Sequence, residues 1–220
     1  MINSKYQSLL TSDEEVMKIA KEMLEVGFVA LDNFLDPTAQ SAFHAIADDR
    51  SNGNKKGEQL KGTAIYDFGY SDEIMLLSQR IYDTRCKITG EKSVQLQKEK
   101  QMVGVPYKDG RQGTPNKVTA YHYDGAYINY LLPLVLPDDQ SKGDGNLIMF
   151  PNLRAKYPAL IVKIISRMLR HSSAFRRWYG QTEVVYNVDT MYIFFGDRSF
   201  HGVEPISNGE RFVVTINSHW

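Results

Sequence analysis

The spacing of apolar residues changes near the middle of the chain. In the first half, apolar positions recur every three to four residues, which predicts amphipathic helices over 12–26, 36–49 and 72–88. Ser12 and Glu15 form a capping box before the first of these helices, and Pro37 suits the first turn of the second. Gly90 is placed to end the third. From residue 118 onward, short apolar runs alternate with Gly, Pro, Asn and Asp, which is typical of β-strands.

The predicted strands are short and numerous. They cover 28–31, 63–70, 94–107, 118–123, 127–136, 143–150, 184–186, 190–195, 201–205 and 211–217. Many short strands after a helical first half indicate a mainly β fold with flanking α-helices, namely a double-stranded β-helix (jelly roll, cupin-like) buttressed by N-terminal helices. A length of 220 residues, without a linker or an internal repeat, favours a single domain over 1–220. Its 1–115 part would supply helical support and flanking strands, and its 116–220 part the β-helix core.

An insertion interrupts the predicted strands at about 156–179. It reads as one helix with an apolar stripe made of Leu160, Ile161, Ile164, Ile165, Met168 and Leu169. Its polar positions are basic, and no acidic residue occurs before Glu183; the basic residues are Arg154, Lys156, Lys163, Arg167, Arg170, Arg176 and Arg177. The segment is either a cover helix with a solvated basic face, or a surface for an anionic partner, or a lid over a substrate pocket.

Composition narrows the classes of function. Lys and Arg together number 26, as do Asp and Glu, so the net charge gives no reason to expect nucleic acid or a membrane as partner. Cys86 is the only cysteine, which excludes an internal disulfide and a cysteine-based zinc site. The N-terminal residues lack the apolar core of a signal peptide, and no apolar run approaches the roughly 18 residues of a membrane span. We therefore expect a cytoplasmic protein, and the sequence leaves its oligomeric state open.

The candidate chemistry rests on four residues. His122 and Asp124 are two positions apart, which on a strand places both side chains on one face. Such a pair can be purely structural, but a second histidine, His201, follows in another strand-like run, and Arg211 comes ten residues after it. Two histidines and one carboxylate form the facial triad that binds non-haem Fe(II) and leaves coordination positions open. An arginine beyond the distal histidine can hold a carboxylate through two parallel hydrogen bonds.

This pattern resembles the Fe(II)/2-oxoglutarate-dependent oxygenases. The resemblance covers residues 115–220 and implies that His122, Asp124 and His201 ligate Fe(II) and act in catalysis. It implies that Arg211 binds the cosubstrate 2-oxoglutarate and that O₂ is the second cosubstrate. The implied activity is a dioxygenase that hydroxylates an unactivated C–H bond of a small molecule, such as a free amino acid or a natural-product intermediate. A peptide or protein hydroxylase and a non-catalytic cupin-like binding protein are the alternatives.

Two departures within this family refine the expectation. Related halogenases replace the ligand carboxylate by Gly or Ala, so the presence of Asp124 favours hydroxylation. The nucleic-acid demethylating branch has a second arginine six residues after the first, whereas this chain has Asn217.

Period two in the last strand places Thr215 and Asn217 on the face of Arg211, as tentative substrate contacts. They could equally be strand residues satisfied by the backbone. Arg198 is either a substrate contact or part of a loop salt bridge, whereas His44, His171 and His219 are not expected to bind metal.

Overall fold

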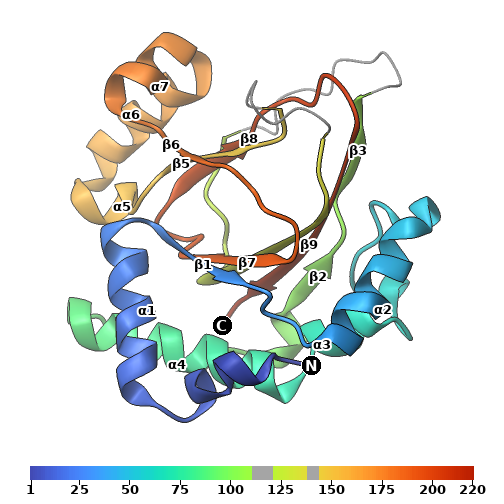
Figure 1. The fold of residues 1–220 in the computed structure, drawn as a ribbon. Coiled ribbons are helices and arrows are strands. Elements are labelled where there is room, and N and C mark those ends of the chain that lie inside the picture. The colour runs from blue at the N-terminus through green and yellow to red at the C-terminus, as the bar shows by residue number, and fades with distance from the viewer. Residues whose placement is uncertain (111–120, 138–143) are drawn as a thin grey trace.

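The computed structural model describes residues 1–110, 121–137 and 144–220 (Figure 1). Helices and two antiparallel sheets make it a mixed α/β fold, where the sequence predicted a mainly β one. The α-helices are α1 (Asp13–Glu25), α2 (Pro37–Asp48), α3 (Ala64–Gly69), α4 (Asp72–Thr89), α5 (Leu153–Lys156), α6 (Ala159–His171) and α7 (Ser173–Tyr179). Short 3₁₀ helices are η1 (Ser4–Leu10), η2 (Arg50–Asn52), η3 (Gly57–Leu60) and η4 (Lys98–Lys100). The strands are β1 (Phe28–Asp32), β2 (Met102–Gly104), β3 (Tyr107–Asp109), β4 (Ile128–Val135), β5 (Leu147–Phe150), β6 (Thr182–Val184), β7 (Thr190–Phe194), β8 (Phe200–Val203) and β9 (Glu210–Ser218).

The larger sheet has six strands in the order β1-β7-β4-β9-β2, and β3 also pairs with β9. The smaller sheet has the order β6-β5-β8 and is continued by a single bridge between His122 and His201. Side chains alternate across the larger sheet, as period two requires. Val213 joins a cluster between the two sheets, while Phe212 and Val214 pack into the core shared with the N-terminal helices. Two facing antiparallel sheets are consistent with a double-stranded β-helix.

The three predicted N-terminal helices are confirmed as α1, α2 and α4. The Ser12 side chain accepts a hydrogen bond from the Glu15 backbone, and the Asp36 side chain accepts one from the Ala39 backbone. Gly90 ends α4 with φ of 73°, a left-handed conformation that glycine adopts without strain. These helices pack their apolar faces on the larger sheet, which leaves its other face to line the space between the sheets (Figure 1).

Two local predictions are wrong. Residues 63–70 form helix α3 rather than a strand, because the Thr63 hydroxyl caps the Tyr66 backbone and Ile65 and Phe68 bury themselves at helical spacing. The flanking strand predicted over 94–107 begins only at Met102, after η4, and then continues as two short strands. Residues 118–120 of the first predicted metal strand, and Gly143 of a later strand, lie outside the described residues. Residues 121–123 of that metal strand form no strand, only the isolated bridge between His122 and His201.

The insertion is three helices instead of one. Pro158 separates α5 from α6, and Ser172 caps α7 by accepting a hydrogen bond from the Phe175 backbone. The apolar stripe is not the buried face either. Only Val162 and Leu169 of α6 are buried, while large apolar side chains are exposed, namely Leu160, Ile161, Ile164 and Met168. The basic residues of α6 are exposed, as predicted for a solvated basic face, but most of the apolar stripe is exposed as well and does not cover the sheet.

Candidate metal centre

His122, Asp124 and His201 come together at the edge of the smaller sheet. The backbones of His122 and His201 exchange two hydrogen bonds of 2.9 and 3.0 Å, which brings the rings to a centroid separation of 4.7 Å. Asp124 lies just beyond, with its carboxylate oxygens 3.1 Å from His122 Nε2 and 3.3 Å from His201 Nε2. One ligand atom from each residue lies within 4.8 Å of the other two. The predicted ligand set therefore converges in space.

The orientation of His201 is fixed by its surroundings. Its Nδ1 lies 3.0 Å from the Ser199 carbonyl oxygen and can donate to it, so Nε2 faces Asp124 and can bind a metal once it carries no proton. Phe194 packs edge-on against the ring at 5.0 Å, and the histidine is buried. A buried, singly oriented imidazole is the state required of a metal ligand.

Asp124 is held by its own set of contacts. Its backbone N–H donates to Gly196 O at 3.1 Å, and the Asn129 amide donates to its carboxylate. A Cβ at position 196 would come 2.4 Å from Asn129 Oδ1, so Gly196 permits this close approach. Burial opposes ionisation of Asp124, but the hydrogen bonds and charges of His122 and His201 outweigh it and hold the pKa below its usual value. The carboxylate is therefore ionised, as a cation ligand must be.

Arg211 lies on β9 in the space between the sheets. Only 4% of its surface is exposed, and its guanidinium carbon is 5.3 Å from the ring centroid of Tyr186. Within the described part of the chain, Arg211 Nε and the Tyr186 hydroxyl are buried without a hydrogen-bond partner. Burial raises the pKa of Tyr186, so this hydroxyl stays protonated and can donate. Two unused buried donors fit a carboxylate acceptor, such as the distal carboxylate of 2-oxoglutarate.

Lys108 is a second cationic residue beside Arg211. It lies opposite Arg211 in the β3–β9 pairing. Burial lowers the pKa of Lys108, and the positive charge of Arg211 lowers it further. Sequence reasoning missed both Lys108 and Tyr186, because only the strand register and the packing of the two sheets bring them to Arg211.

No family model and no curated protein matches the sequence. Several solved structures match the fold. A prolyl 4-hydroxylase from Phytophthora capsici is 14% identical with a TM-score of 0.62. The match covers all of this chain and 66% of the hydroxylase, so this chain spans just under two thirds of the length of that protein. The epimerase SnoN from nogalamycin biosynthesis, solved with Fe³⁺, alpha ketoglutarate and nogalamycin RO, is 14% identical with a TM-score of 0.63 over 94% of this chain and 84% of that chain. A prolyl hydroxylase from Trichoplax adhaerens, solved with a peptide fragment, is 15% identical with a TM-score of 0.52 over 97% and 93% of the two chains.

The chain has the fold of the iron- and 2-oxoglutarate-dependent oxygenases. The predicted resemblance is confirmed at this level, since SnoN is solved with iron and alpha ketoglutarate on the same fold. Identities of 12–15% among such structures carry no more than the fold. Among the described residues, no helix is both long enough and apolar enough to cross a membrane.

The remaining predicted positions have mixed outcomes. Thr215 donates to the Gly104 carbonyl at 3.2 Å, which is the backbone alternative left open by the sequence. Asn217 is paired with Asn129, the residue that binds Asp124, and both Thr215 and Asn217 line a hollow of about 230 Å³. Their contact with a substrate stays a prediction. Arg198 forms an ion pair with Glu91, which is the loop salt bridge.

None of the other histidines joins the group of three that could hold a metal, among the residues that the structure describes. His44 lies on helix α2, and its Nε2 is 2.8 Å from Oδ1 of Asp189.

Proposed function

We propose that this chain is an Fe(II)- and 2-oxoglutarate-dependent dioxygenase that hydroxylates an unactivated C–H bond of a small molecule. The proposal includes a double-stranded β-helix as the core of a single oxygenase domain over 1–220. The observation that carries it is the convergence of His122, Asp124 and His201, with their ligand atoms within 4.8 Å. The unused buried donors of Arg211 and Tyr186 between the same two sheets support it.

In this proposal each residue has one role. His122, Asp124 and His201 bind Fe(II) on one face and leave the other face open. Arg211, with the Tyr186 hydroxyl beside it, binds and orients 2-oxoglutarate through its distal carboxylate. When bound, Fe(II), 2-oxoglutarate and O₂ supply the oxidising chemistry that the side chains lack. Buried walls of the two sheets exclude water from this space.

Asp124 bears on the outcome of the reaction. As an ionised ligand it would fill the position that a halide needs in the related halogenases, so hydroxylation is proposed over halogenation. Thr215 and Asn217, on the face of Arg211, are proposed as substrate contacts. A peptide substrate is the second candidate, because the Trichoplax adhaerens prolyl hydroxylase of the same fold is solved with a peptide fragment. Nucleic acid is not proposed, because the formal net charge is zero.

The test is succinate formation from 2-oxoglutarate with added Fe(II) and a metabolite extract or a peptide library. Wild type should form succinate in the presence of one of these pools, and the responding pool identifies the substrate class. His122→Ala, Asp124→Ala and His201→Ala should each abolish it while the far-ultraviolet circular dichroism stays unchanged. His44→Ala is the matched control and should retain activity, since His44 pairs with Asp189 outside the metal group. Near-wild-type turnover in any of the three ligand variants would remove that residue from the site.

A further inference from the structure

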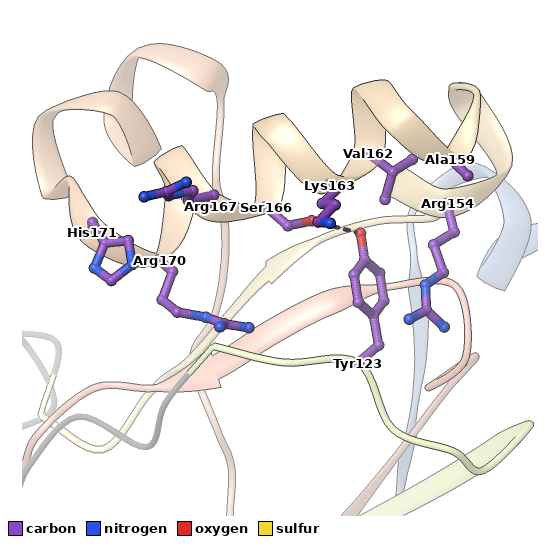
Figure 2. Close-up of a pocket in the computed structure, with 9 residues that line it drawn as sticks. All are labelled: Tyr123, Arg154, Ala159, Val162, Lys163, Ser166, Arg167, Arg170 and His171. Atoms are coloured by element: carbon purple, nitrogen blue, oxygen red, sulfur yellow. Dashed lines mark hydrogen bonds between the residues drawn. The ribbon is translucent and has the colours of Figure 1, made fainter.

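A basic hollow of about 630 Å³ lies between helix α6 and the segment that carries Tyr123 (Figure 2). Its lining includes five residues that are or can become cationic, namely Arg154, Lys163, Arg167, Arg170 and His171. Among the residues that the structure describes, no carboxylate lines it. The metal-binding proposal gives these side chains no role.

Two of the cations are already oriented. Arg154 donates to the Asp197 carbonyl at 3.1 Å and stacks over the Tyr123 ring at 3.9 Å. Arg170 donates through Nε to the Tyr121 carbonyl at 3.2 Å. Figure 2 shows Tyr123 reaching up to α6 between these two arginines. Because each guanidinium uses few of its five donors on carbonyl oxygens, further N–H groups remain for a ligand.

The other two permanent cations are not held by any acidic partner that the structure describes. Lys163 and Arg167 form no ion pair within the described ranges of the chain. The four cations are exposed at the surface of one hollow, and a dianion between them would be attracted by all four. The hydroxyls of Tyr123 and Ser166, 3.1 Å apart, add neutral donors at the same place.

The orientation of α6 leaves apolar side chains exposed, so packing alone does not explain it. A helix normally buries its apolar stripe, yet α6 leaves Leu160 at 71% exposure while its cations line the hollow. Leu169 packs in a cluster with Ile148, Phe150 and Phe200, which fixes the helix to the smaller sheet. The arrangement directs charge toward the hollow at the expense of apolar burial, which is the mark of a binding surface.

The hollow adjoins a second hollow that a metal ligand lines. Tyr123, between the ligands His122 and Asp124 in the chain, reaches α6, where its hydroxyl lies 3.1 Å from that of Ser166 (Figure 2). Arg154 lines both this hollow and a second one of about 400 Å³, which Asp124 also lines. The two hollows share Arg154, so an anion in the basic hollow would lie beside the hollow that Asp124 lines.

We propose that the basic hollow under α6 binds a phosphate-type dianion that forms part of the small-molecule substrate. The arginine forks and Lys163 match the oxygens of a tetrahedral dianion. Because no described residue of the lining is a carboxylate, an anion is favoured over a zwitterion. The inference rests on the proposed oxygenase function for the identity of the substrate, but the anion site itself does not depend on it.

The first experiment uses inorganic pyrophosphate as the probe and metal-free protein, so oxygenase activity plays no part. Calorimetry should show pyrophosphate binding to wild type at one site. The double variant Lys163→Gln/Arg167→Gln should lose about tenfold or more in affinity, because two charge-assisted contacts are removed. The exchange Lys163→Arg/Arg167→Lys keeps both charges and should recover most of the affinity.

The matched control is Lys21→Gln/Lys87→Gln, which removes the same charge from exposed positions on α1 and α4. It should bind pyrophosphate as wild type does. Equal affinity of the hollow variant and wild type would overturn the site. An equal loss in the hollow variant and the control would do so too, because the effect would then be general electrostatics.

The second experiment tests the link to the substrate. Anion-exchange fractions of a metabolite extract are assayed for stimulation of succinate formation, and the stimulating fraction should be the one retained on the exchanger. Lys163→Gln/Arg167→Gln should raise the apparent KM for that fraction about tenfold with little change in kcat. An unchanged KM, with pyrophosphate binding lost, would overturn the assignment of the anion to the substrate. Pyrophosphate binding without succinate formation in any fraction would contradict the oxygenase function and leave the anion site standing.

Discussion

Arg211 is the residue proposed to bind 2-oxoglutarate. It is buried, and its Nε lacks a partner among the described residues. Arg211→Ala should weaken 2-oxoglutarate binding by about 2–5 kcal/mol, or roughly 30- to several-thousand-fold, because one partner of a buried charge pair is lost. Iron affinity should stay unchanged, since Arg211 does not belong to the metal group. Calorimetry on Fe(II)-loaded protein without oxygen measures both.

Arg211→Lys is the informative companion variant. It keeps the charge but not the planar fork, so its affinity for 2-oxoglutarate should fall between those of wild type and Arg211→Ala. An unchanged dissociation constant in both variants would place the cosubstrate elsewhere in the chain.

Asn129 acts on the metal through Asp124. Its amide donates to the Asp124 carboxylate, which orients the ligand. Asn129→Ala should lower the affinity for Fe(II) about ten- to hundredfold, the range seen when outer contacts of metal ligands are removed. An Asn187→Ala variant controls for loss of an asparagine, because Asn187 is exposed and remote from the metal group. Iron titration of the two variants side by side decides the matter, and equal affinities would exclude this role for Asn129.

Among the single elements, helix α6 buries some of its apolar residues and exposes others. Leu169 is fully buried and Leu160 is 71% exposed. Leu169→Ala should lower the free energy of unfolding by about 2–5 kcal/mol, whereas Leu160→Ala should change it by about 0.5 kcal/mol or less. Urea denaturation gives both values. A larger loss for Leu160→Ala would show that its side chain is buried, contrary to the structure.

The sequence was informative where the signal is local. Capping residues and helical spacing predicted α1, α2 and α4, and the two-residue spacing of His122 and Asp124 predicted a shared face. It failed where aromatic residues suit either a strand or a helix, as in α3, since the cap from Thr63 decided the outcome. It could not determine which face of α6 turns inward, because that depends on what the sheet presents to it. Lys108 was missed because the sequence of one strand does not specify its register with a partner strand. Tyr186 was missed because only the packing of the two sheets brings it to Arg211.

At the scale of the whole molecule, one buried arginine joins the helical layer to the loop before β8. Arg85 of α4 is 2% exposed, contacts Asp197 at 2.8 Å, and lies 4.9 Å from the Phe195 ring centroid. Removing it leaves Asp197 without its main partner in a largely buried place. Arg85→Ala should therefore cost about 3–5 kcal/mol of stability.

Arg80→Ala, on the same helix, is the control for this prediction. Arg80 pairs with Asp13, whose side chain is 92% exposed, so its loss should cost about 1 kcal/mol or less. Thermal and urea unfolding of both variants give the comparison. Equal stabilities would mean that the Arg85–Asp197 pair does not hold the two layers together.

As a dioxygenase of the proposed kind, this molecule would use Fe(II) and 2-oxoglutarate to insert an oxygen atom from O₂ into a substrate. The most direct measurement is mass spectrometry of a metabolite extract incubated with the protein, Fe(II) and 2-oxoglutarate under ¹⁸O₂. Such an enzyme should place one labelled oxygen atom in a new product and one in succinate, and both labels should be lost in His201→Ala. Absence of label from product and succinate while 2-oxoglutarate is consumed, or the same labelled product from His201→Ala, would contradict it.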